Sequence, residues 1–311
     1  MEVKAWTYEE FPEFAREVEG AKIIETTGDE VGVLYMHDVE YANVSGTALH
    51  LQILVPFSRN ENFDYLGEQS FKKPCVVFVQ GSAWMQQYVY MKVGEMAPLA
   101  KKGYVCAIVE YRHSGIASFP AQAVDTGNAI RFLKKNCRRF GIDPDRMVVA
   151  GDSSGGHTAM WTAMLHNDNE PTNLYPGISA DIRGVVNYYG STSVMAPDSN
   201  PQTVNHCLPD SPEGMVMGGK NLLENPELAR ALSVECNIDN ETVLPPVLIF
   251  HGTKDRTVNC EGSVILFQKL RETGHDVQLY LIKGADHGGA EFWTDKVIGI
   301  VDEFIRTKCF A

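Results

Sequence analysis

A glycine-rich turn in the middle of the chain contains a serine in the setting of a nucleophile. Ser153 lies in residues 151–157 (GDSSGGH), which directly follow the apolar run RMVVA and precede the helical run TAMWTAMLH. A G-x-S-x-G pattern between strand and helix is typical of a nucleophile elbow, because its glycines allow a sharp turn from which the hydroxyl projects. The helix N-terminus also presents N–H groups and positive dipole near the reacting oxygen. We therefore predict that Ser153 is the nucleophile of an acyl-transfer reaction.

Two loops further along the chain carry the partners that a serine nucleophile needs. A serine hydroxyl reacts slowly at neutral pH unless a base accepts its proton and a carboxylate orients that base. Asp255 lies in residues 251–258 (HGTKDRTV) after the apolar run PVLIF, and His287 lies in residues 284–289 (GADHGG) after VQLYLIK. Because the ends of buried parallel strands meet at one edge of a sheet, we expect both side chains beside Ser153. This predicts His287 as the general base and Asp255 as its orienting acid.

Other residues near these motifs offer alternatives. Asp255 alone could cap a turn, and His287 alone could be an ordinary surface histidine. Asp286 is a rival carboxylate, although a residue adjacent to the histidine is badly placed to reach its Nδ1. His157 and His251 are rival bases, but one begins the helix after the elbow and the other ends a strand. We expect Asp286, His157 and His251 to be structural.

Acyl transfer also needs N–H donors for the developing oxyanion. One donor ordinarily comes from the residue after the nucleophile, here Ser154, through its backbone and not its hydroxyl. Another comes from the loop after the third strand, which is residues 80–84 (QGSAW).

The elements that must position these residues fall into two patterns. Residues 31–41 and 47–56 alternate apolar and polar side chains around an NVSG turn, which predicts an antiparallel hairpin at one edge of a sheet. Short, continuously apolar runs then alternate with helical patterns, which is typical of a parallel sheet buried on both faces. The predicted strands are 75–80, 104–111, 146–151, 182–189, 246–252 and 277–283, and the predicted helices are 92–102, 121–139, 154–166, 261–273 and 291–307. The fold class is therefore α/β, with a mostly parallel central sheet of about eight strands and helices on both faces.

Two segments differ from this regular pattern. Residues 1–30 are predicted to be an N-terminal helical extension, with an amphipathic helix from about Tyr8 to Val18 that packs outside the main domain. Residues 190–244 are rich in Pro, Asn, Ser, Gly and Met and contain one short helical pattern, NPELARALS. So long an irregular stretch in a compact domain is usually functional, so we interpret it as a substrate-facing insertion. Residues 31–311 then form a single catalytic domain.

The composition and charge of the chain limit the classes of molecule that we expect it to bind. The formal charge of −13 and pI near 5.1 argue against nucleic acid and anionic membrane surfaces, which attract positively charged faces. The first twenty residues are acidic and have no apolar core of a signal sequence, and no apolar stretch approaches a membrane span, so we expect a cytoplasmic protein. Seven cysteines occur without a C-x-x-C pair, and no metal-ligand or cofactor motif is found. We expect neither a cofactor nor a metal.

In these motifs the chain resembles the α/β-hydrolase esterases related to hormone-sensitive lipase. It is more similar still to their bacterial carboxylesterase and feruloyl-esterase-like branch. The resemblance covers roughly residues 31–307 and is carried by FVQGSAW, EYRHSGIASFPAQAVDTGNAIRFLKKN with GIDPDR, AGDSSGGH, PPVLIFHGTKDRTV and GADHGG followed by EFW. The family's serine, acid and histidine correspond to Ser153, Asp255 and His287.

The family's oxyanion loop, usually His-Gly-Gly-x-Trp, corresponds to residues 80–84. The resemblance thus implies backbone donors at Ser82 and Ala83, together with Ser154. The chain departs from the family pattern at Gln80, where the family has His, and at Ser82, where it commonly has Gly. A serine is less free than glycine if the loop needs a positive φ.

The resemblance implies a serine carboxylic ester hydrolase without cofactors, acting through an acyl-enzyme on short-chain or aromatic esters such as acetyl or feruloyl groups of plant carbohydrates. Its partner would be a small-molecule or oligosaccharide ester. One alternative is an arylformamidase-like amidase with the same triad, and another is a non-catalytic binding protein on a hydrolase scaffold. The residues that either line the substrate pocket or simply pack at strand ends and loops are Tyr188, Tyr189, Met195, Met215 and Met217.

Overall fold

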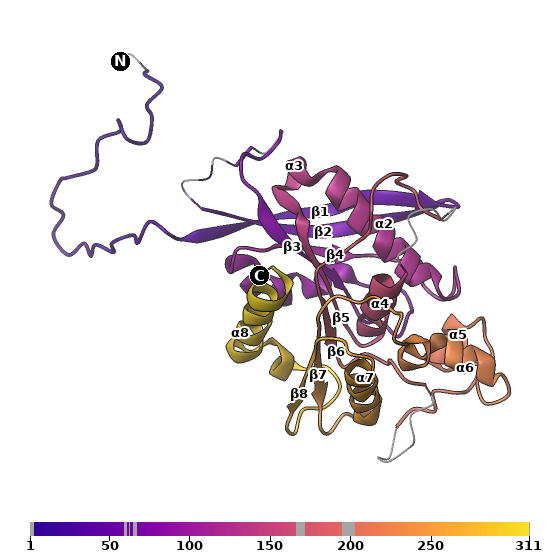
Figure 1. Ribbon diagram of the computed structural model, residues 1–311. Helices are drawn as coiled ribbons and strands as arrows, with labels where there is room; N and C mark the ends of the chain where they lie inside the picture. The colour runs from indigo at the N-terminus through magenta and orange to yellow at the C-terminus, as the bar shows by residue number, and fades with distance from the viewer. Residues whose placement is uncertain are drawn as a thin grey trace.

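A single eight-stranded sheet forms the centre of the protein in the computed structural model (Figure 1), which describes residues 3–58, 61, 63–64, 67–165, 172–194 and 203–310. The strands are β1 (Val31–Val44), β2 (Thr47–Ser58), β3 (Lys73–Val79), β4 (Val105–Val109), β5 (Ile142–Asp152), β6 (Val185–Tyr188), β7 (Val247–Gly252) and β8 (Val277–Ile282). Their order is β1-β2-β4-β3-β5-β6-β7-β8. β2 pairs antiparallel with β1 and β4, and every later pair is parallel. The predicted edge hairpin and the predicted parallel sheet are both confirmed.

Helices cover both faces of the sheet because the buried strands are apolar on both sides. Alternate residues of β3 enter different cores: Val77 packs with α2, α4 and α7, whereas Phe78 packs with α1 and α8. The helices are α1 (Val93–Lys101), α2 (Ala121–Lys135), α3 (Cys137–Phe140), α4 (Ser154–Met164), α5 (Pro212–Val216), α6 (Pro226–Leu232), α7 (Cys260–Glu272) and α8 (Asp295–Phe304). Short turns of other helix types are η1 (Val89–Lys92), η2 (Val234–Asn237), η3 (Ala290–Trp293) and η4 (Ile305–Cys309). None of the helices described has the length and apolar composition needed to cross a bilayer.

The N-terminal segment is not the helix that the sequence pattern predicts. Residues 3–30 contain turns but no helix, are exposed throughout, and run away from the body of the protein before β1 (Figure 1). Two physical reasons explain the error. Pro12 lies inside the expected helix, where it has no N–H to donate and clashes with the preceding turn. An amphipathic helix of this length also gains most of its stability by packing its apolar face, and this segment has no surface to pack against.

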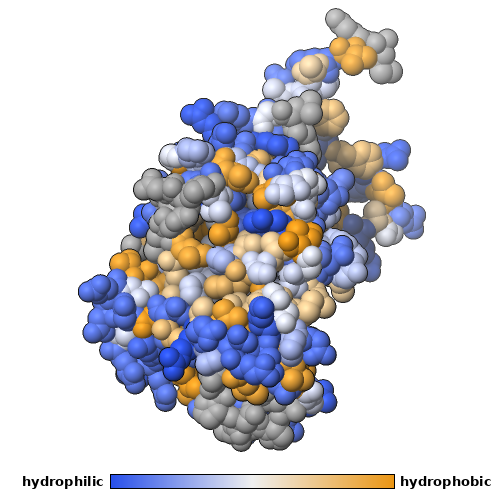
Figure 2. Space-filling view, turned by 90° about the vertical axis from the view of Figure 1, so that its right-hand side faces the viewer, coloured by the Kyte–Doolittle hydropathy of each residue, from blue (hydrophilic) through white to orange (hydrophobic). Residues whose placement is uncertain are grey.

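The insertion has more structure than its sequence indicates. Besides α6, which corresponds to the predicted NPELARALS pattern, it forms α5 and η2. Together with Trp84, apolar side chains of this segment form a small separate core. α5 and α6 lie on the right of Figure 1, and Figure 2 shows that side with apolar residues gathered across its middle and hydrophilic residues around them. The insertion therefore covers the side of the sheet that carries α4.

Candidate active site

Ser153 occupies a strained turn between β5 and α4. Its φ is 53° and its ψ is −126°, a conformation that non-glycine residues adopt rarely and at a cost of about 1–3 kcal/mol. The Ser153 N–H donates to the Tyr188 carbonyl at 2.9 Å, which ties the turn to the end of β6. A Cβ on Gly155 would overlap the Val79 carbonyl, so glycine is required there for α4 to approach the sheet. The local sequence and the sheet thus hold the serine in the elbow geometry.

The structure brings the three predicted side chains together. The Nε2 of His287 lies 2.9 Å from the Ser153 Oγ, and its Nδ1 lies 2.7 Å from Oδ2 of Asp255. Asp255 is on the loop after β7, and His287 is on the loop after β8. One imidazole therefore bridges a hydroxyl and a carboxylate at the carboxyl ends of three parallel strands. This arrangement can take a proton from the serine while the carboxylate fixes the tautomer of the ring.

The Asp255 carboxylate is saturated with donors. Its Oδ1 accepts the N–H groups of Thr257 at 2.9 Å and Val258 at 2.8 Å. Its Oδ2 is contacted by His287 and also by Nε2 of the fully buried His251 at 3.1 Å. Burial opposes ionisation, but the hydrogen bonds from the two histidines outweigh it and hold the pKa of Asp255 well below its usual range. Asp255 is therefore ionised at neutral pH.

The three alternative residues, Asp286, His157 and His251, have partners other than the Ser153 hydroxyl. Asp286 pairs with Arg256 at the surface, with Nε to Oδ2 at 2.7 Å. His157 is buried among aromatic rings, and its Nε2 lies 2.8 Å from the Leu232 carbonyl. His251 does reach the site, but from behind Asp255, and its other nitrogen lies 2.7 Å from the Ser263 hydroxyl. The contact between His251 and the carboxylate was not foreseen from the sequence, because it depends on the turn that the chain makes after β7.

The loop between β3 and η1 differs in one respect from the expected donor set. The Ser82 N–H donates to Oγ of Ser154 at 2.9 Å, so it is occupied in this structure, and the Ser154 hydroxyl has a partner that the sequence did not predict. Within the described residues, the N–H groups of Ala83 and Ser154 have no acceptor. Ser82 also does not need a positive φ, which falls instead on Ala83 at 56° and Trp84 at 53°. Ala83 and Ser154 are therefore the N–H groups left open for an oxyanion.

Asp152, Lys92 and Tyr189 connect the loop of residues 80–84 with His287. Asp152 accepts the Gly81 N–H at 2.7 Å, and its other oxygen lies 3.0 Å from the half-buried Lys92 ammonium and 3.3 Å from the Tyr189 hydroxyl. The Tyr189 ring meets His287 edge to face at 4.9 Å. Burial alone would lower the pKa of Lys92, but Asp152 and Glu95 raise it above the usual value. Asp152 lies inside the GDSSGG motif, which is the one sequence signal that could have indicated this cluster.

The insertion is fastened to the loop that carries Asp255. The Thr203 N–H donates to the Arg256 carbonyl at 3.0 Å, and Nε2 of His206 lies 2.7 Å from the Thr257 carbonyl. His206 also lies 2.8 Å from Glu213, which accepts the Ser191 hydroxyl at 2.7 Å. The insertion thus contacts the acid loop through hydrogen bonds, and the bond between Ser191 and Glu213 joins two parts of the insertion to each other.

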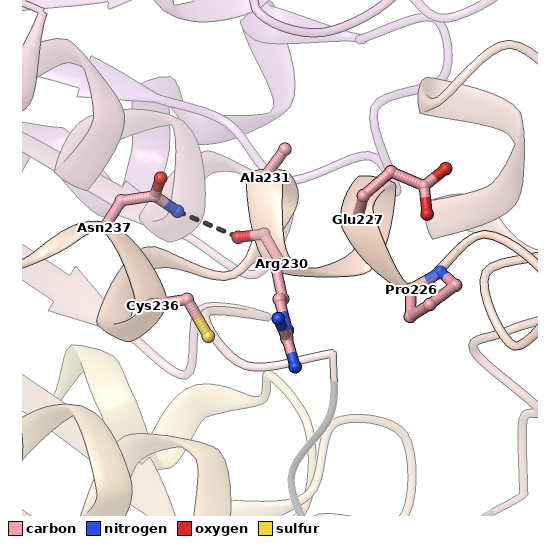
Figure 3. A pocket seen from close by; sticks show the side chains of 6 residues that line it. All are labelled: Pro226, Glu227, Arg230, Ala231, Cys236 and Asn237. Carbon is pink, nitrogen blue, oxygen red and sulfur yellow. Dashed lines mark hydrogen bonds between the residues drawn. The ribbon is translucent and has the colours of Figure 1, made fainter.

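The residues weighed as a pocket lining have different positions. Tyr188 is a core residue stacked on Phe250, whereas Tyr189 contacts His287. Met215 is half-buried, Met217 packs beside Trp84, and Met195 lies outside the described residues. A separate pocket lies between α6 and η2 (Figure 3), and no predicted site residue lines it. Its lining residues are Pro226, Glu227, Arg230, Ala231, Cys236 and Asn237.

Metal ligands do not cluster in the part of the chain that the structure covers: it contains no group of three His, Cys, Asp or Glu side chains that could hold an ion. The groups gathered around Ser153 are one imidazole, one carboxylate and backbone N–H donors.

Comparisons with known proteins show the fold and the family of this chain. Esterase LipQ of Mycobacterium tuberculosis is 29% identical over 65% of this chain and 47% of its own length, so the chain spans about half the length of the curated relatives it matches. A carbohydrate esterase from gut microbiota superposes with a TM-score of 0.75 at 22% identity, covering 92% of this chain and 99% of that one. An esterase of Thermogutta terrifontis, solved with propionate bound, gives a TM-score of 0.65 at 22% identity, covering 90% and 94%. The fold is therefore that of the α/β-hydrolases. The BD-FAE family model matches residues 65–270, which is more than half of the chain, and the chain belongs to the BD-FAE family.

Proposed function

We propose that this protein is a serine carboxylic ester hydrolase in which Ser153, His287 and Asp255 form the catalytic triad. The observation that carries the proposal is the single imidazole that contacts the serine hydroxyl at 2.9 Å and the carboxylate at 2.7 Å. The esterase relatives and the membership of the BD-FAE family support the same reaction class.

The reaction proceeds in two acyl-transfer steps. His287 Nε2 takes the hydroxyl proton as Ser153 Oγ attacks the ester carbonyl carbon, and the carbonyl oxygen becomes an oxyanion held by the N–H groups of Ala83 and Ser154. The carbon–oxygen bond to the alcohol then breaks, His287 returns the proton to the leaving alcohol, and an acyl-enzyme remains. Water, deprotonated by His287, then attacks the acyl carbon. The bond from that carbon to Ser153 Oγ breaks, Oγ takes the proton from His287, and the carboxylic acid leaves. The ionised Asp255 stabilises the imidazolium that forms in each step.

We further propose short-chain or aromatic acyl groups, of the acetyl or feruloyl type, carried on plant carbohydrates. Support comes from the carbohydrate esterase neighbour, from the propionate bound to the Thermogutta esterase, and from the apolar residues gathered on the face in Figure 2. Rates on p-nitrophenyl esters of increasing chain length, methyl ferulate, acetylated xylo-oligosaccharides and N-formylkynurenine separate the acyl classes from each other and from the amidase alternative. Highest kcat/KM on N-formylkynurenine would contradict the ester assignment.

Replacing the nucleophile tests the proposed reaction directly. Ser153→Ala is expected to lower p-nitrophenyl acetate turnover by at least ~10³-fold, because it removes the hydroxyl that His287 contacts. A fluorophosphonate probe should label the wild type and not the variant. Circular dichroism controls for folding, and retained turnover in a folded Ser153→Ala protein would contradict the proposal.

A further inference from the structure

Three hydroxyl groups meet behind the loop that carries Ala83. The Ser82 hydroxyl donates to the Met85 carbonyl at 2.7 Å and lies 3.1 Å from the hydroxyl of Tyr111. The Ser82 N–H donates to Oγ of Ser154 at 2.9 Å. Tyr111 is 3% exposed and Ser154 is 1% exposed, so these groups have little water to bind instead. Tyr111 and Ser154 therefore hold Ser82 at two points, its hydroxyl and its N–H, and we call these three residues the hydroxyl network.

The network joins segments that are distant in sequence. Tyr111 follows β4, Ser154 begins α4, and Ser82 follows β3. The Gln87 side chain fastens the same region, because it accepts the Tyr111 N–H at 2.8 Å and donates to the Gln80 carbonyl at 2.9 Å. Burial raises the pKa of Tyr111 to about 12, and the hydroxyls of Ser82 and Ser154 oppose that rise.

The loop needs such support because its conformation is strained. Ala83 and Trp84 both have positive φ, and residues in that region persist only where their surroundings determine them. Trp84 is held by burial and by the edge of the His157 ring at 5.0 Å. Ala83 has only a methyl group and cannot be held through its own side chain. Its neighbour Ser82 is held at both its N–H and its hydroxyl.

We propose that Tyr111 and Ser154 are positioning residues, whose hydroxyls hold the Ser82 backbone so that the Ala83 N–H stays aimed at the oxyanion. The inference rests on the proposed function, since it assigns these hydroxyls a purpose in ester hydrolysis. Ser154 then acts twice: its N–H is an oxyanion donor, and its hydroxyl fixes the loop that supplies the second donor. A glycine at position 82 would not carry the hydroxyl that Tyr111 contacts here.

The test compares Tyr111→Phe, Ser154→Ala and the double variant with wild type. Each single variant is expected to lower kcat on p-nitrophenyl acetate about tenfold with KM within about twofold. The lost hydrogen bond positions the Ala83 N–H, and that donor acts only in the transition state. The double variant should lose little more than either single variant, since the hydroxyls act as one unit. Affinity for a trifluoromethyl ketone, whose hemiketal oxygen occupies the oxyanion site, should fall by the same factor as kcat/KM.

Tyr104→Phe is the matched control, because Tyr104 is equally buried and its hydroxyl donates to Asp302 at 2.7 Å, away from the site. Wild-type kcat and ketone affinity in both Tyr111→Phe and Ser154→Ala would overturn the inference, as would an equal loss of kcat in Tyr104→Phe. Ser153→Ala keeps the two proposals apart. If it is inactive while the network variants behave as wild type, only the network fails, and if it stays active, the proposed function fails regardless of them.

Discussion

The two sides of the site are held in different ways. On the acid–base side, Asp255 is fixed mainly within its own loop, by the N–H groups of Thr257 and Val258. On the oxyanion side, the loop of residues 80–84 is held by side chains from several segments, among them Asp152 and Ser154. A loop braced mainly by its own backbone depends on few outside contacts, here those of the insertion at Arg256 and Thr257, whereas a loop held from several directions depends on each partner. We therefore expect large effects from a few residues on the first side and moderate effects from many on the second.

The largest effect is expected on the acid–base side, from Asp255→Asn. The amide cannot stabilise the imidazolium and favours the wrong tautomer of His287, so turnover should fall by ~10³- to 10⁴-fold. The measurement is kcat on p-nitrophenyl acetate at neutral pH. Asp286→Asn is the matched control, because it removes the neighbouring surface carboxylate and should keep most of the activity. Similar losses of kcat in both variants would mean that the effect is not specific to Asp255.

A smaller effect is expected on the oxyanion side, from Asp152→Asn. The amide oxygen can still accept the Gly81 N–H, but Lys92 loses one of its two carboxylate partners. We expect kcat to fall about tenfold and the free energy of unfolding to fall by about 2 kcal/mol, less than for a fully broken buried pair because Glu95 remains. Asp302→Asn, which removes another largely buried carboxylate paired with lysine and arginine, should leave kcat unchanged. Unaltered kcat in Asp152→Asn would show that the loop does not depend on the charge of Asp152 or on its pairing with Lys92.

The smallest effect on turnover is expected from His157 beneath Trp84, which contributes to stability at acid pH. Burial lowers the pKa of His157 from 6.5 to about 4. Between these values the unfolded chain binds a proton there and the folded protein does not, so the free energy of unfolding falls as pH drops through this window. His157→Gln should remove about 3 kcal/mol of the change between pH 7 and pH 4. Urea unfolding at both pH values measures it, with the exposed His37→Gln as control, and an undiminished change in His157→Gln would contradict the assignment.

The parts of the fold and site that could be predicted share one property, which is that their signals are local. Ser153, Asp255 and His287 each directly follow an apolar strand, and strand ends of a parallel sheet meet at one edge. The hydroxyl network gave no such signal, because the contact of Tyr111 with Ser82 exists only after β3 and β4 have paired. His251 is only four residues from Asp255, but its contact with the carboxylate depends on how the chain turns after β7, which the sequence pattern does not specify.

The errors outside the site have local causes too. Periodicity alone predicted a helix over residues 8–18, although Pro12 interrupts it and no surface is available to pack its apolar face. α5 was missed because it is short, although Ser211 caps it by accepting the Gly214 N–H at 3.0 Å and Pro212 opens its first turn. The composition of the insertion favours irregular structure outside the NPELARALS pattern, and α5 lies outside it.

The attachment of the insertion at Arg256 and Thr257 couples two properties that are usually separate. Residues 203 and 206 belong to the irregular insertion, yet they hydrogen-bond to the backbone next to the carboxylate that we propose orients His287. Sequence drift that reshapes substrate choice in this segment would therefore also retune the speed of the chemistry, so selectivity and rate in this protein should evolve together.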